Sequence, residues 1–565
     1  MFVRITQAEG RSYVKIVEAF RDDMGATRQR VIATLGRLEH VRAGGADALV
    51  RGLMRVSGTA APAGMDLSAV RFDPALSVGD TWLLTALWHR LGFGESFRRV
   101  LRNGRSSFDC ERLLRVMVFN RLCDPTSKLG VMRWLEGSRV PAVDAASVTH
   151  QRLLRAMDTL AERADAMQRS LATLLRPLID QELSVVFYDL TTVGVEGHTE
   201  LAGDVRALGK SKDGGIARQF MLGVVQTAQG LPIAHRVWEG NTGETTTLQP
   251  VIQEVLAQFP VKRVVLVADR GLLSLDNLEQ LQSLKVRGGQ PLEFVLAVPG
   301  RRYAEFDELL QPLRAQCETA TQEVFGEAAW KGLRLIWAHD PVRAAEQTRL
   351  RQARIDEIIA SAQARAGKLD AQEDGEVFRG RRLSDSGAKA WMFREVSEAN
   401  LGAVIKVDLA GEAFTFDIDE RALQRARLHD GKLLLVTNVA DLAPAEVVER
   451  YKSLADIERG FKVLKSDIEI APVFHRLPER IKAHALICFL ALVLHRVLRM
   501  QLKDAKSPHS PQRVLEIVKR IQLHQVTLPN QERATGVGEL DPVQREIFET
   551  LGLDTPTRQR LETAL

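Results

Sequence analysis

The sequence has few of the residues that mark disulfide-bonded or zinc-finger proteins. Its 565 residues include four cysteines, whose spacing matches neither a zinc site nor a disulfide framework: Cys110, Cys123, Cys317 and Cys488. Such sparse usage is typical of proteins from a reducing compartment. The N-terminal stretch MFVRITQAEG has no apolar signal core, and the longest apolar run, Ala485–Leu494, is too short to cross a bilayer. We therefore expect a soluble cytoplasmic protein with no membrane partner.

A strong net charge is also missing. Lysine and arginine total 77 and aspartate and glutamate total 72, so the formal net charge is only +5. This small excess excludes nucleic-acid binding through bulk charge and leaves that role to local basic patches. No low-complexity tract or internal repeat is visible. The length then predicts a globular protein of about two to four domains.

Two apolar runs that lead into a carboxylate are the most informative features present. In SVVFYDLTTV the run Val185–Tyr188 precedes Asp189, and in KRVVLVADRG the run Val264–Val267 precedes Asp269. Continuous β-branched and aromatic runs are typical of strands buried on both faces of an α/β sheet. A carboxylate beside such a core is costly unless it is hydrogen-bonded, paired or bound to a metal. One such aspartate is most simply structural, but the recurrence favours a shared site.

A third carboxylate is expected on a later helix. Residues 444–465, PAEVVERYKSLADIERGFKVLK, have helical periodicity with at most one break. Tyr451, Glu458 and Lys465 follow at intervals of seven, which places them within about 40° of one another around one helix. The adjacent face is apolar and would lie on the sheet, and Lys462 falls close to this stripe.

The order of the patterns along the chain predicts the domain layout. Alternating residues predict strands at the N-terminus, helical periods follow, and strands and helices then alternate. The expected segments are a small β-meander with a candidate DNA contact (1–60), a helical DNA-binding module (78–180), a first catalytic part (181–300), an insertion with its own sheet and a charged helical arm (301–440), a second catalytic part (441–500) and a C-terminal helical region (501–565).

Arginines are concentrated between two expected helices of the helical module. A helix-turn-helix-like DNA contact and a plain helical bundle both fit this pattern, and we favour the DNA contact. The residues concerned are Arg98, Arg99, Arg102 and Arg105.

With these residues in view, the sequence resembles the DDE transposases of bacterial insertion sequences. The branch it resembles carries its third carboxylate in a Y-x2-R-x3-E-x6-K signature, matched here by Tyr451, Glu458 and Lys465, with Leu454 at the arginine position. The resemblance extends to YDLTT around Asp189, ADRG around Asp269, GNTGETTT (240–247) and PVFHRLPERIKAH (472–484). It covers roughly residues 180–500.

The resemblance implies an RNase H-like fold. In that α/β fold a mixed five-stranded sheet carries the first aspartate on its first strand and the second at the end of its fourth. The glutamate lies on a later helix, after a β-rich insertion. The order of strands predicted from the residues alone gives the same arrangement.

It also implies the chemistry. Asp189, Asp269 and Glu458 would hold two divalent ions, magnesium or manganese, because clustered carboxylates suit hard cations that also bind phosphate oxygens. Tyr451 and Lys465 would position phosphates of the DNA. Lys462 is a candidate substitute for the arginine missing at Leu454. Arg270, next to Asp269, would pair with a carboxylate or with DNA.

The implied function is transposition of an insertion sequence in a bacterial cytoplasm, at the nucleoid. The protein would bind double-stranded DNA, both element ends and target, as a homodimer, and would cleave and join strands. A metal-dependent nuclease that cuts without joining is the first alternative. A catalytically inactive transposase-derived DNA-binding protein is the second, and the basic patches disfavour a small-molecule metallohydrolase.

Overall fold

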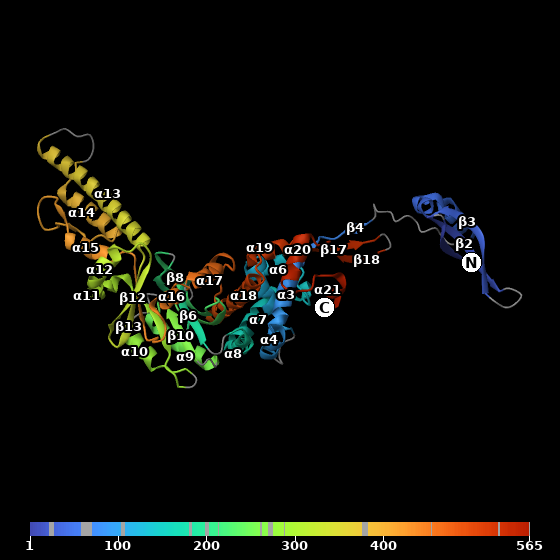
Figure 1. The fold of residues 1–565 in the computed structure, drawn as a ribbon, viewed down its shortest axis with the longest axis horizontal. Helices are drawn as coiled ribbons and strands as arrows, with labels where there is room; N and C mark the ends of the chain where they lie inside the picture. The colour runs from blue at the N-terminus through green and yellow to red at the C-terminus, as the bar shows by residue number, and fades with distance from the viewer. Residues whose placement is uncertain are drawn as a thin grey trace. The chain divides into compact units, whose positions relative to one another are not determined.

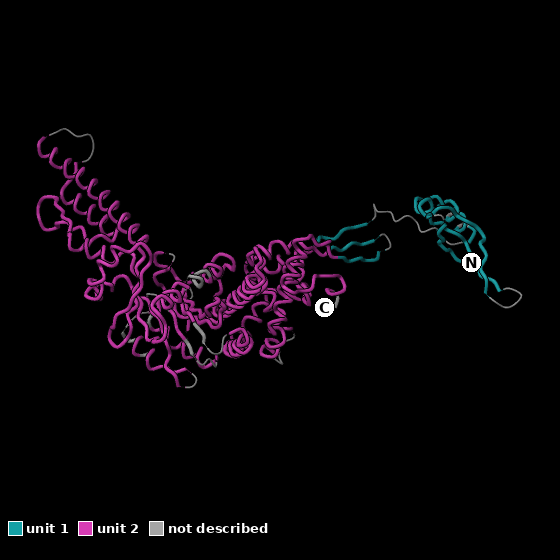
Figure 2. Tube along the Cα trace, in the orientation of Figure 1, with its two compact units in different colours: residues 1–75, 524–536 teal, residues 76–523, 537–565 magenta. Residues whose placement is uncertain are grey.

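The structure is a computed structural model that describes most of the chain. It describes residues 1–8, 10–21, 27–57, 70–102, 108–179, 183–197, 203–212, 214–259, 263–268, 275–286, 289–375, 382–453, 455–528 and 531–563. The side chains of a few of these, including residues 183–185 and 455–459, lie outside the description. The chain divides into two compact units (Figure 2): residues 1–75 with 524–536, and residues 76–523 with 537–565.

The first unit begins with an antiparallel meander. Strands β1 (Phe2–Ala8), β2 (Arg11–Arg21) and β3 (Thr27–Arg37) lie in that order, and helix α2 (Asp47–Ser57) follows after a short helical turn. The alternating apolar and polar residues produce this structure because successive side chains of a strand point to opposite faces. Of the described residues in this meander, Val14 and Val17 are the buried ones. The unit also contains β4 (Arg71–Phe72) and β18 (Arg533–Val537).

The second unit begins with a helical module. Its helices are α3 (Gly79–Arg90), α4 (Phe93–Leu101), α5 (Cys110–Cys123), α6 (Lys128–Glu136), α7 (His150–Glu162) and α8 (Ala164–Leu175). Side-chain caps begin several of them, because the first N–H groups of a helix have no partner within it. The Asp109 carboxylate accepts from two such groups of α5, and the hydroxyls of Ser127 and Thr149 cap α6 and α7.

A helix from far along the chain completes the core of this module. Helix α18 (Pro478–Asp504) packs against α7, α5 and α3. It is long and apolar enough to cross a membrane, but 94% of its most apolar stretch is buried inside the protein. It is therefore a central core helix, with the helical module on one side of it.

The largest part of the second unit is a mixed nine-stranded sheet (Figure 1). The strand order is β12-β13-β16-β11-β10-β6-β8-β7, and β9 also pairs with β8. Strands β6, β10 and β11 are parallel and the other pairs are antiparallel. The bounds are β6 (Leu183–Gly194), β7 (Ala207–Lys210), β8 (Ile216–Thr227), β9 (Pro232–Glu239), β10 (Arg263–Ala268), β11 (Glu293–Ala297), β12 (Val324–Trp330), β13 (Leu333–His339) and β16 (Lys432–Thr437).

The prediction of a five-stranded sheet beside an insertion with its own sheet is wrong in this respect. Strands β12, β13 and β16, from the expected insertion and its end, continue the main sheet. The reason is that β13 is buried on both faces: Leu335 and Ile336 point to opposite sides and both are fully buried. The separate sheet consists of the short pair β14 (Ile405–Val407) and β15 (Phe416–Ile418).

The expected charged helical arm is longer than its sequence pattern indicated. Helix α13 extends from Pro341 to Glu373 and packs against α14 (Asp385–Glu398). With α15 (Glu420–His429) and the β14–β15 pair, these helices enclose a small core of their own.

The core of the main sheet has two parts. Phe187, Val265 and Val295 lie in the smaller part, on the face that helix α16 (Pro444–Lys452) covers. The larger part includes Tyr188 and Leu266 on the opposite face, with α9 (Glu244–Gln258) and α10 (Leu275–Ser283), and it also reaches the first face at β8 and β9, where α18 packs. Because side chains alternate along a strand, Asp189 shares the face of Phe187 and not that of Tyr188.

The remaining elements follow the sheet. Helix α17 (Ala455–Ser466) comes directly after α16, and α19 (Pro511–Val518), α20 (Pro542–Thr550) and α21 (Arg558–Thr563) lie near the C-terminus. This end, expected to be helical, also contains strands: β17 (Gln522–Thr527) pairs with β5 (Leu76–Ser77).

Candidate active site at the end of the parallel strands

Asp189 lies where the parallel part of the sheet ends. Strand β6 lies between β10 and β8, and the described β10 ladder ends where Ala268 is paired with Tyr188. From Asp189 to Gly194, β6 continues along β8. Ligands of open α/β sheets bind at the carboxyl ends of the strands, and Asp189 occupies such an end.

The Asp189 carboxylate is partly accessible in an otherwise buried strand. Its side chain is 16% exposed, whereas Tyr188 and Leu190 on either side are 0% and 2% exposed. The Leu190 N–H donates a 2.7 Å hydrogen bond to Asp189 Oδ1. The Leu190 N–H therefore holds one oxygen of the carboxylate in place.

Lys212 places a positive charge next to this carboxylate. It lies in the hairpin between β7 and β8, and its Nζ is 3.9 Å from Asp189 Oδ1. The same ammonium donates to the carbonyl oxygen of Leu190 at 2.6 Å, and the Lys212 N–H donates to Thr192 Oγ1 at 3.0 Å. The hairpin is thereby attached to the strand that carries Asp189.

No sequence pattern predicted the contact of Lys212 with Asp189. It lies 22 positions from Leu190 in a glycine-containing loop, and no periodicity relates the two residues. The only available signal was the loop composition, which is equally typical of a solvated hairpin.

Helix α17 packs on the same face of the sheet as Asp189. A Cβ added at Gly460 would come within 3.0 Å of Gln226 Nε2 and 3.1 Å of Arg496 Nη2, so the helix backbone lies close to both side chains. Gln226 is the cross-strand partner of Phe187, and cross-strand partners point to the same face. The helix that carries Glu458 therefore approaches β8 at Gln226, on the face of the sheet that also carries Asp189.

Arg496 is a buried cation beside this helix. It is on α18 and only 2% exposed, in a stretch whose basic residues are otherwise those of a solvated face. Together with Gln226, it supports α17 from beneath at Gly460.

The other residues of the expected acidic triplet lie outside the described part. Asp269 and Arg270 are outside the described residues, and the side chain of Glu458 is not described although its helix is. Among the side chains that the structure does describe, no group of three metal-ligating residues comes together. The assignments of Asp269, Arg270 and Glu458 stay predictions.

The predicted stripe of Tyr451, Glu458 and Lys465 does not lie on one helix. Helix α16 ends at Lys452 and α17 begins at Ala455, so Tyr451 precedes the break and the other two follow it. On α17, Phe461 and Leu464 are buried as expected, Lys465 is half-buried and Lys462 is exposed. The break removes the angular relation on which the stripe was based, and Leu454 lies at the break, outside the described residues.

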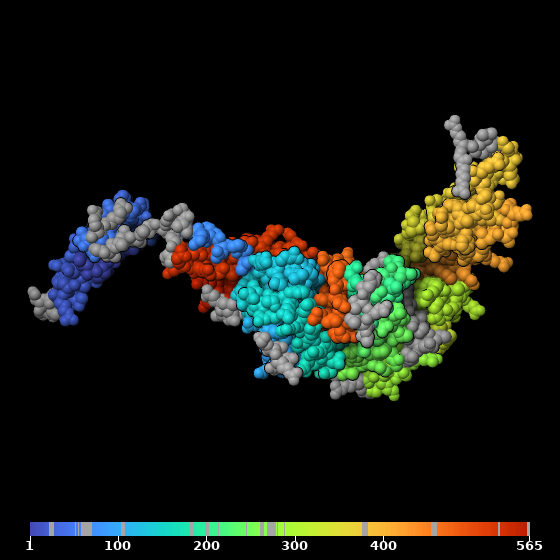
Figure 3. All heavy atoms as spheres, turned by 180° about the vertical axis from the view of Figure 1, so that it is seen from behind, coloured from blue at the N-terminus to red at the C-terminus, as the bar shows by residue number. Residues whose placement is uncertain are grey.

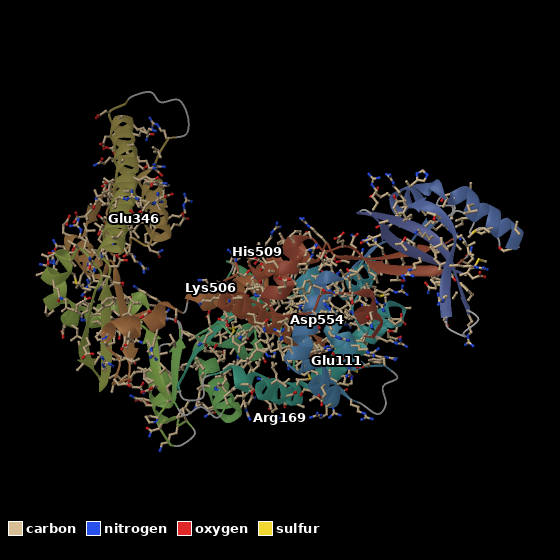
Figure 4. The ribbon with its side chains drawn as sticks, turned by 45° about the vertical axis from the view of Figure 1, so that its right-hand side comes forward. Glu111, Arg169, Glu346, Lys506, His509 and Asp554 are labelled. Atoms are coloured by element: carbon tan, nitrogen blue, oxygen red, sulfur yellow. The ribbon has the colours of Figure 1, made fainter. Side chains whose placement is uncertain are left out.

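The arginines of the helical module differ in their surroundings. Arg98 pairs with Asp109 and Glu111 at 3.2 and 2.8 Å, in the region labelled at Glu111 in Figure 4. Arg99 pairs with Glu95 at 2.8 Å on the surface. Arg102 is exposed just after α4, and Arg105 lies outside the described residues. Two of the four are thus neutralised by neighbouring carboxylates.

The donor chemistry at Asp189 fits a divalent cation. A carboxylate oxygen is a hard ligand of the kind that magnesium and manganese prefer. A cation already lies against it, because the Lys212 ammonium occupies that neighbourhood. The carboxylate thus already attracts a positive charge, and a metal ion bound at the same place would compete with the ammonium for it.

Comparison with known protein families identifies the class. Residues 180–494, more than half of the chain, match the model of the transposase DDE domain, and residues 3–63 match the N-terminal domain of IS1634 family transposases. The protein is thus an enzyme of the transposase class, and domains of this class use divalent metal ions. It belongs to the DDE transposase family.

Comparison with individual proteins adds little. No curated protein matches the sequence. A structure described as a piggyBac transposase synaptic complex with hairpin DNA aligns with 78% of this chain and 79% of its own, at 8% identity and a TM-score of 0.37. A TM-score this low carries no argument about fold.

Proposed function

We propose that this enzyme binds the terminal inverted repeats of an insertion sequence and catalyses metal-dependent strand cleavage and strand transfer. The observation that carries the proposal is the position of Asp189, at the carboxyl end of the parallel strands and on the face that α17 covers. The match to the DDE domain supports the same assignment.

The proposed ligand set is Asp189, Asp269 and Glu458. Asp269 follows Ala268 in the sequence, and Ala268 is paired with the residue before Asp189. Glu458 belongs to the helix whose Gly460 lies against Gln226, a neighbour of Asp189 across β6 and β8. Both relations support an RNase H-like arrangement of the three carboxylates.

Two magnesium or manganese ions held by these carboxylates would activate the attacking oxygen and stabilise the leaving oxygen of an in-line phosphoryl displacement. The chain's own residues position the DNA. Tyr451, Lys462 and Lys465 lie on the two helices beside the site and are proposed to contact phosphates. Arg270 is proposed to pair with a carboxylate or with DNA.

The remaining parts of the chain are assigned to DNA and to a second copy of the protein. The N-terminal meander and the helical module are proposed to bind the element ends. Arg102 and Arg105 contribute there, and Arg98 and Arg99 do so only if DNA displaces their carboxylate partners. A homodimer in a bacterial cytoplasm, at the nucleoid, would bring two element ends together with target DNA.

The test is magnesium-dependent cleavage of a duplex that carries the inverted repeat flanking the gene. We expect Asp189→Asn, Asp269→Asn and Glu458→Gln each to lose cleavage while keeping the unfolding temperature of the wild type. Glu196→Gln is the matched control, because Glu196 is an exposed carboxylate just beyond the end of β6. Full activity in any of the three variants contradicts the ligand assignment.

A second readout separates the proposal from its alternatives. Products joined to target DNA are expected from a transposase. Cleaved but never joined products would indicate a nuclease, and tight binding of the ends without metal-dependent cleavage would indicate an inactive DNA-binding protein.

A further inference from the structure

A basic pocket lies between the helical module and the chain that follows α17. It has a volume of about 430 Å³, and its walls are the end of α5, the starts of α6 and α7, and residues 469–480. In Figure 3 the cyan helices of the module and the orange segment after α17 adjoin on the surface. We call it the Lys128 pocket, after the residue at the first position of α6.

Two buried cations line this pocket without a carboxylate partner among the described residues. Lys128 is 6% exposed and makes no hydrogen bond or ion pair with any of them. Arg121 is 5% exposed, and its Nη1 donates to the backbone carbonyls of Ile468 and Glu469, at 3.5 and 3.2 Å. Its Nε has no hydrogen-bond partner among the residues that the structure describes. Burying charges in this way is costly unless an anion compensates them.

The pKa of Lys128 reflects the cost of burying its charge. Burial, with Arg121 nearby, lowers the pKa of Lys128 to about 7. Burial likewise lowers the pKa of His475, on the opposite wall, to about 4, so that this imidazole is neutral near pH 7. An anion entering the pocket would restore the full charge of Lys128.

The other charged groups of the pocket are already satisfied or face solvent. Arg480 makes a two-pronged ion pair with Asp158, at 2.7 and 2.8 Å. The backbone carbonyl oxygen of Glu469 accepts a hydrogen bond from Arg121, and the Glu469 side chain is exposed. Lys128 and Arg121 therefore stand apart as cations that no described residue neutralises.

Two further features favour a phosphate on a nucleic acid. Lys128 opens α6, a helix of 9 residues, and the N-terminus of a helix attracts anions through its free N–H groups and its dipole. Phe474, at the pocket wall, is 71% exposed. An exposed aromatic ring beside a phosphate site suits stacking on a base, which a free phosphate ion would not use.

The pocket is joined to the strand that carries Asp189. Val473, in its wall, forms a parallel bridge with Val195; its N–H donates to the Gly194 carbonyl at 3.1 Å, and its carbonyl accepts from Glu196 N–H at 2.9 Å. Val195 is six positions beyond Asp189, or roughly 20 Å along an extended chain. DNA rises about 3.4 Å per step, so the wall of the pocket at Val473 is about six nucleotide steps from Asp189, and Lys128 and Arg121 lie on other parts of the lining.

We propose that the Lys128 pocket binds a backbone phosphate of the DNA in the active site, several nucleotides from the phosphate that is cut. This assignment rests on the proposed function, since it takes the bound DNA to reach Asp189. It adds a positioning contact at the far end of β6, supplied by Lys128 and Arg121.

The first test is the salt dependence of DNA binding by Lys128→Met, measured by fluorescence anisotropy with a duplex carrying the flanking inverted repeat. Each neutralised phosphate contributes about 0.9 to the slope of log affinity against log salt, so we expect a slope smaller by about that amount. The affinity should fall about tenfold, as for loss of a charge-assisted hydrogen bond. Lys482→Met, a change of an exposed lysine on α18 outside this pocket, is expected to leave the slope unchanged.

The variant is expected to fold. Methionine fills the space of the lysine stem without burying a charge, so the unfolding temperature should equal or exceed that of the wild type. If the unfolding temperature of Lys128→Met falls instead, Phe474→Ala serves as the second variant, because the exposed Phe474 ring is not packed in the core. It should weaken binding of the duplex and leave the unfolding temperature unchanged.

The second test locates the phosphate. Neutral methylphosphonates are placed one at a time along each strand. Substitution at one position several nucleotides from the cut should weaken binding by the wild type and have no effect on Lys128→Met, while other positions weaken both proteins equally. Equal losses at every position would overturn the assignment.

Each failure points to a different conclusion. If inorganic phosphate at low millimolar concentration raises the unfolding temperature of the wild type but not of Lys128→Met, and the DNA salt slope does not change, the pocket takes a free phosphate and the proposal is wrong. If Lys128→Met shows no altered slope while the wild type cleaves the ends, the inference fails and the proposed function stands. A Lys128-dependent slope without cleavage by the wild type would keep Lys128 as a DNA contact, but it would contradict the proposed function and the placement of that contact relative to a cut phosphate.

Discussion

The ion pair between Lys212 and Asp189 should compete with metal binding. Without metal, the ammonium neutralises part of the carboxylate charge, so a metal ion must displace it or bear its repulsion. In Lys212→Met the side chain keeps its length and loses its charge. We therefore expect Lys212→Met to bind Mn²⁺ more tightly than the wild type.

The size of this effect follows from the geometry. Two unit charges 3.9 Å apart interact by about 1 kcal/mol in water and by about 4 kcal/mol at the effective dielectric constant of a protein surface. The side chains of Lys212 and Asp189 are 39% and 16% exposed, which favours the lower half of this range. A difference of about 1–2 kcal/mol corresponds to a roughly 5- to 30-fold gain in metal affinity.

The assay is a Mn²⁺ titration followed by the electron paramagnetic resonance of the free ion. Lys210→Met is the matched control, because Lys210 is exposed at the end of β7 in the same hairpin and the change of net charge is identical. The reasoning is refuted if the two variants bind Mn²⁺ equally well. Tighter metal binding by Lys212→Met together with slower cleavage at saturating metal would add a role for this lysine in holding DNA.

Two further predictions concern the support of α17 and the buried histidines. Gly460→Ala places a Cβ 3.0–3.1 Å from Gln226 and Arg496, so the helix that carries Glu458 must shift. We expect DNA cleavage to slow by about tenfold while the affinity for DNA is unchanged. Gly300→Ala is the control and should behave as the wild type, because an added Cβ there meets no atom within 4 Å. Burial, together with Arg496 and Arg499, lowers the pKa of His495 to about 3, and burial lowers that of His484 well below its usual value. Because the unfolded chain binds these protons more readily, their contribution to stability is present above about pH 6.5 and is lost as the pH falls toward 4, by about 1.4 kcal/mol per pH unit for each group. Urea unfolding at pH 7.5 and 5.5 measures this loss, and His495→Gln should reduce it; an identical loss in that variant would contradict the assignment.

Some of the site could be predicted because it depends on local sequence. The run before Asp189 is buried on both faces, and that pattern placed the carboxylate on a central strand. In the same way, the runs RQFMLGVVQTA and LPIAHRVWEG flank the turn residues Gln229 and Gly230, a pattern that predicts the antiparallel strands β8 and β9. These features depend on alternation and turn residues within a few positions of one another.

Other features depend on tertiary contacts that leave no periodic signal. The contact of Lys212 with Asp189 is made by a folded hairpin, and the close approach at Gly460 involves residues from three distant segments. The helix break between Lys452 and Ala455 falls in a stretch whose residues all suit a helix. Likewise, the apolar pattern of β13 is the same whether the strand belongs to a separate sheet or extends the main sheet. The predicted number of strands in the main sheet was therefore wrong.

Helix α18 has a consequence for the order of events during synthesis. It is the central helix of a module whose other helices end at Leu175, so about 300 further residues must leave the ribosome before that core can close. At roughly 5–20 residues per second, synthesis of these residues takes about 15–60 s. During that time the faces of α5 and α7 that pack against α18 in the folded protein are not covered by it. A protein terminated before Pro478 would lack that partner permanently. Shortened products of this gene should therefore be captured by chaperones or degraded, and they should not accumulate as free helical modules.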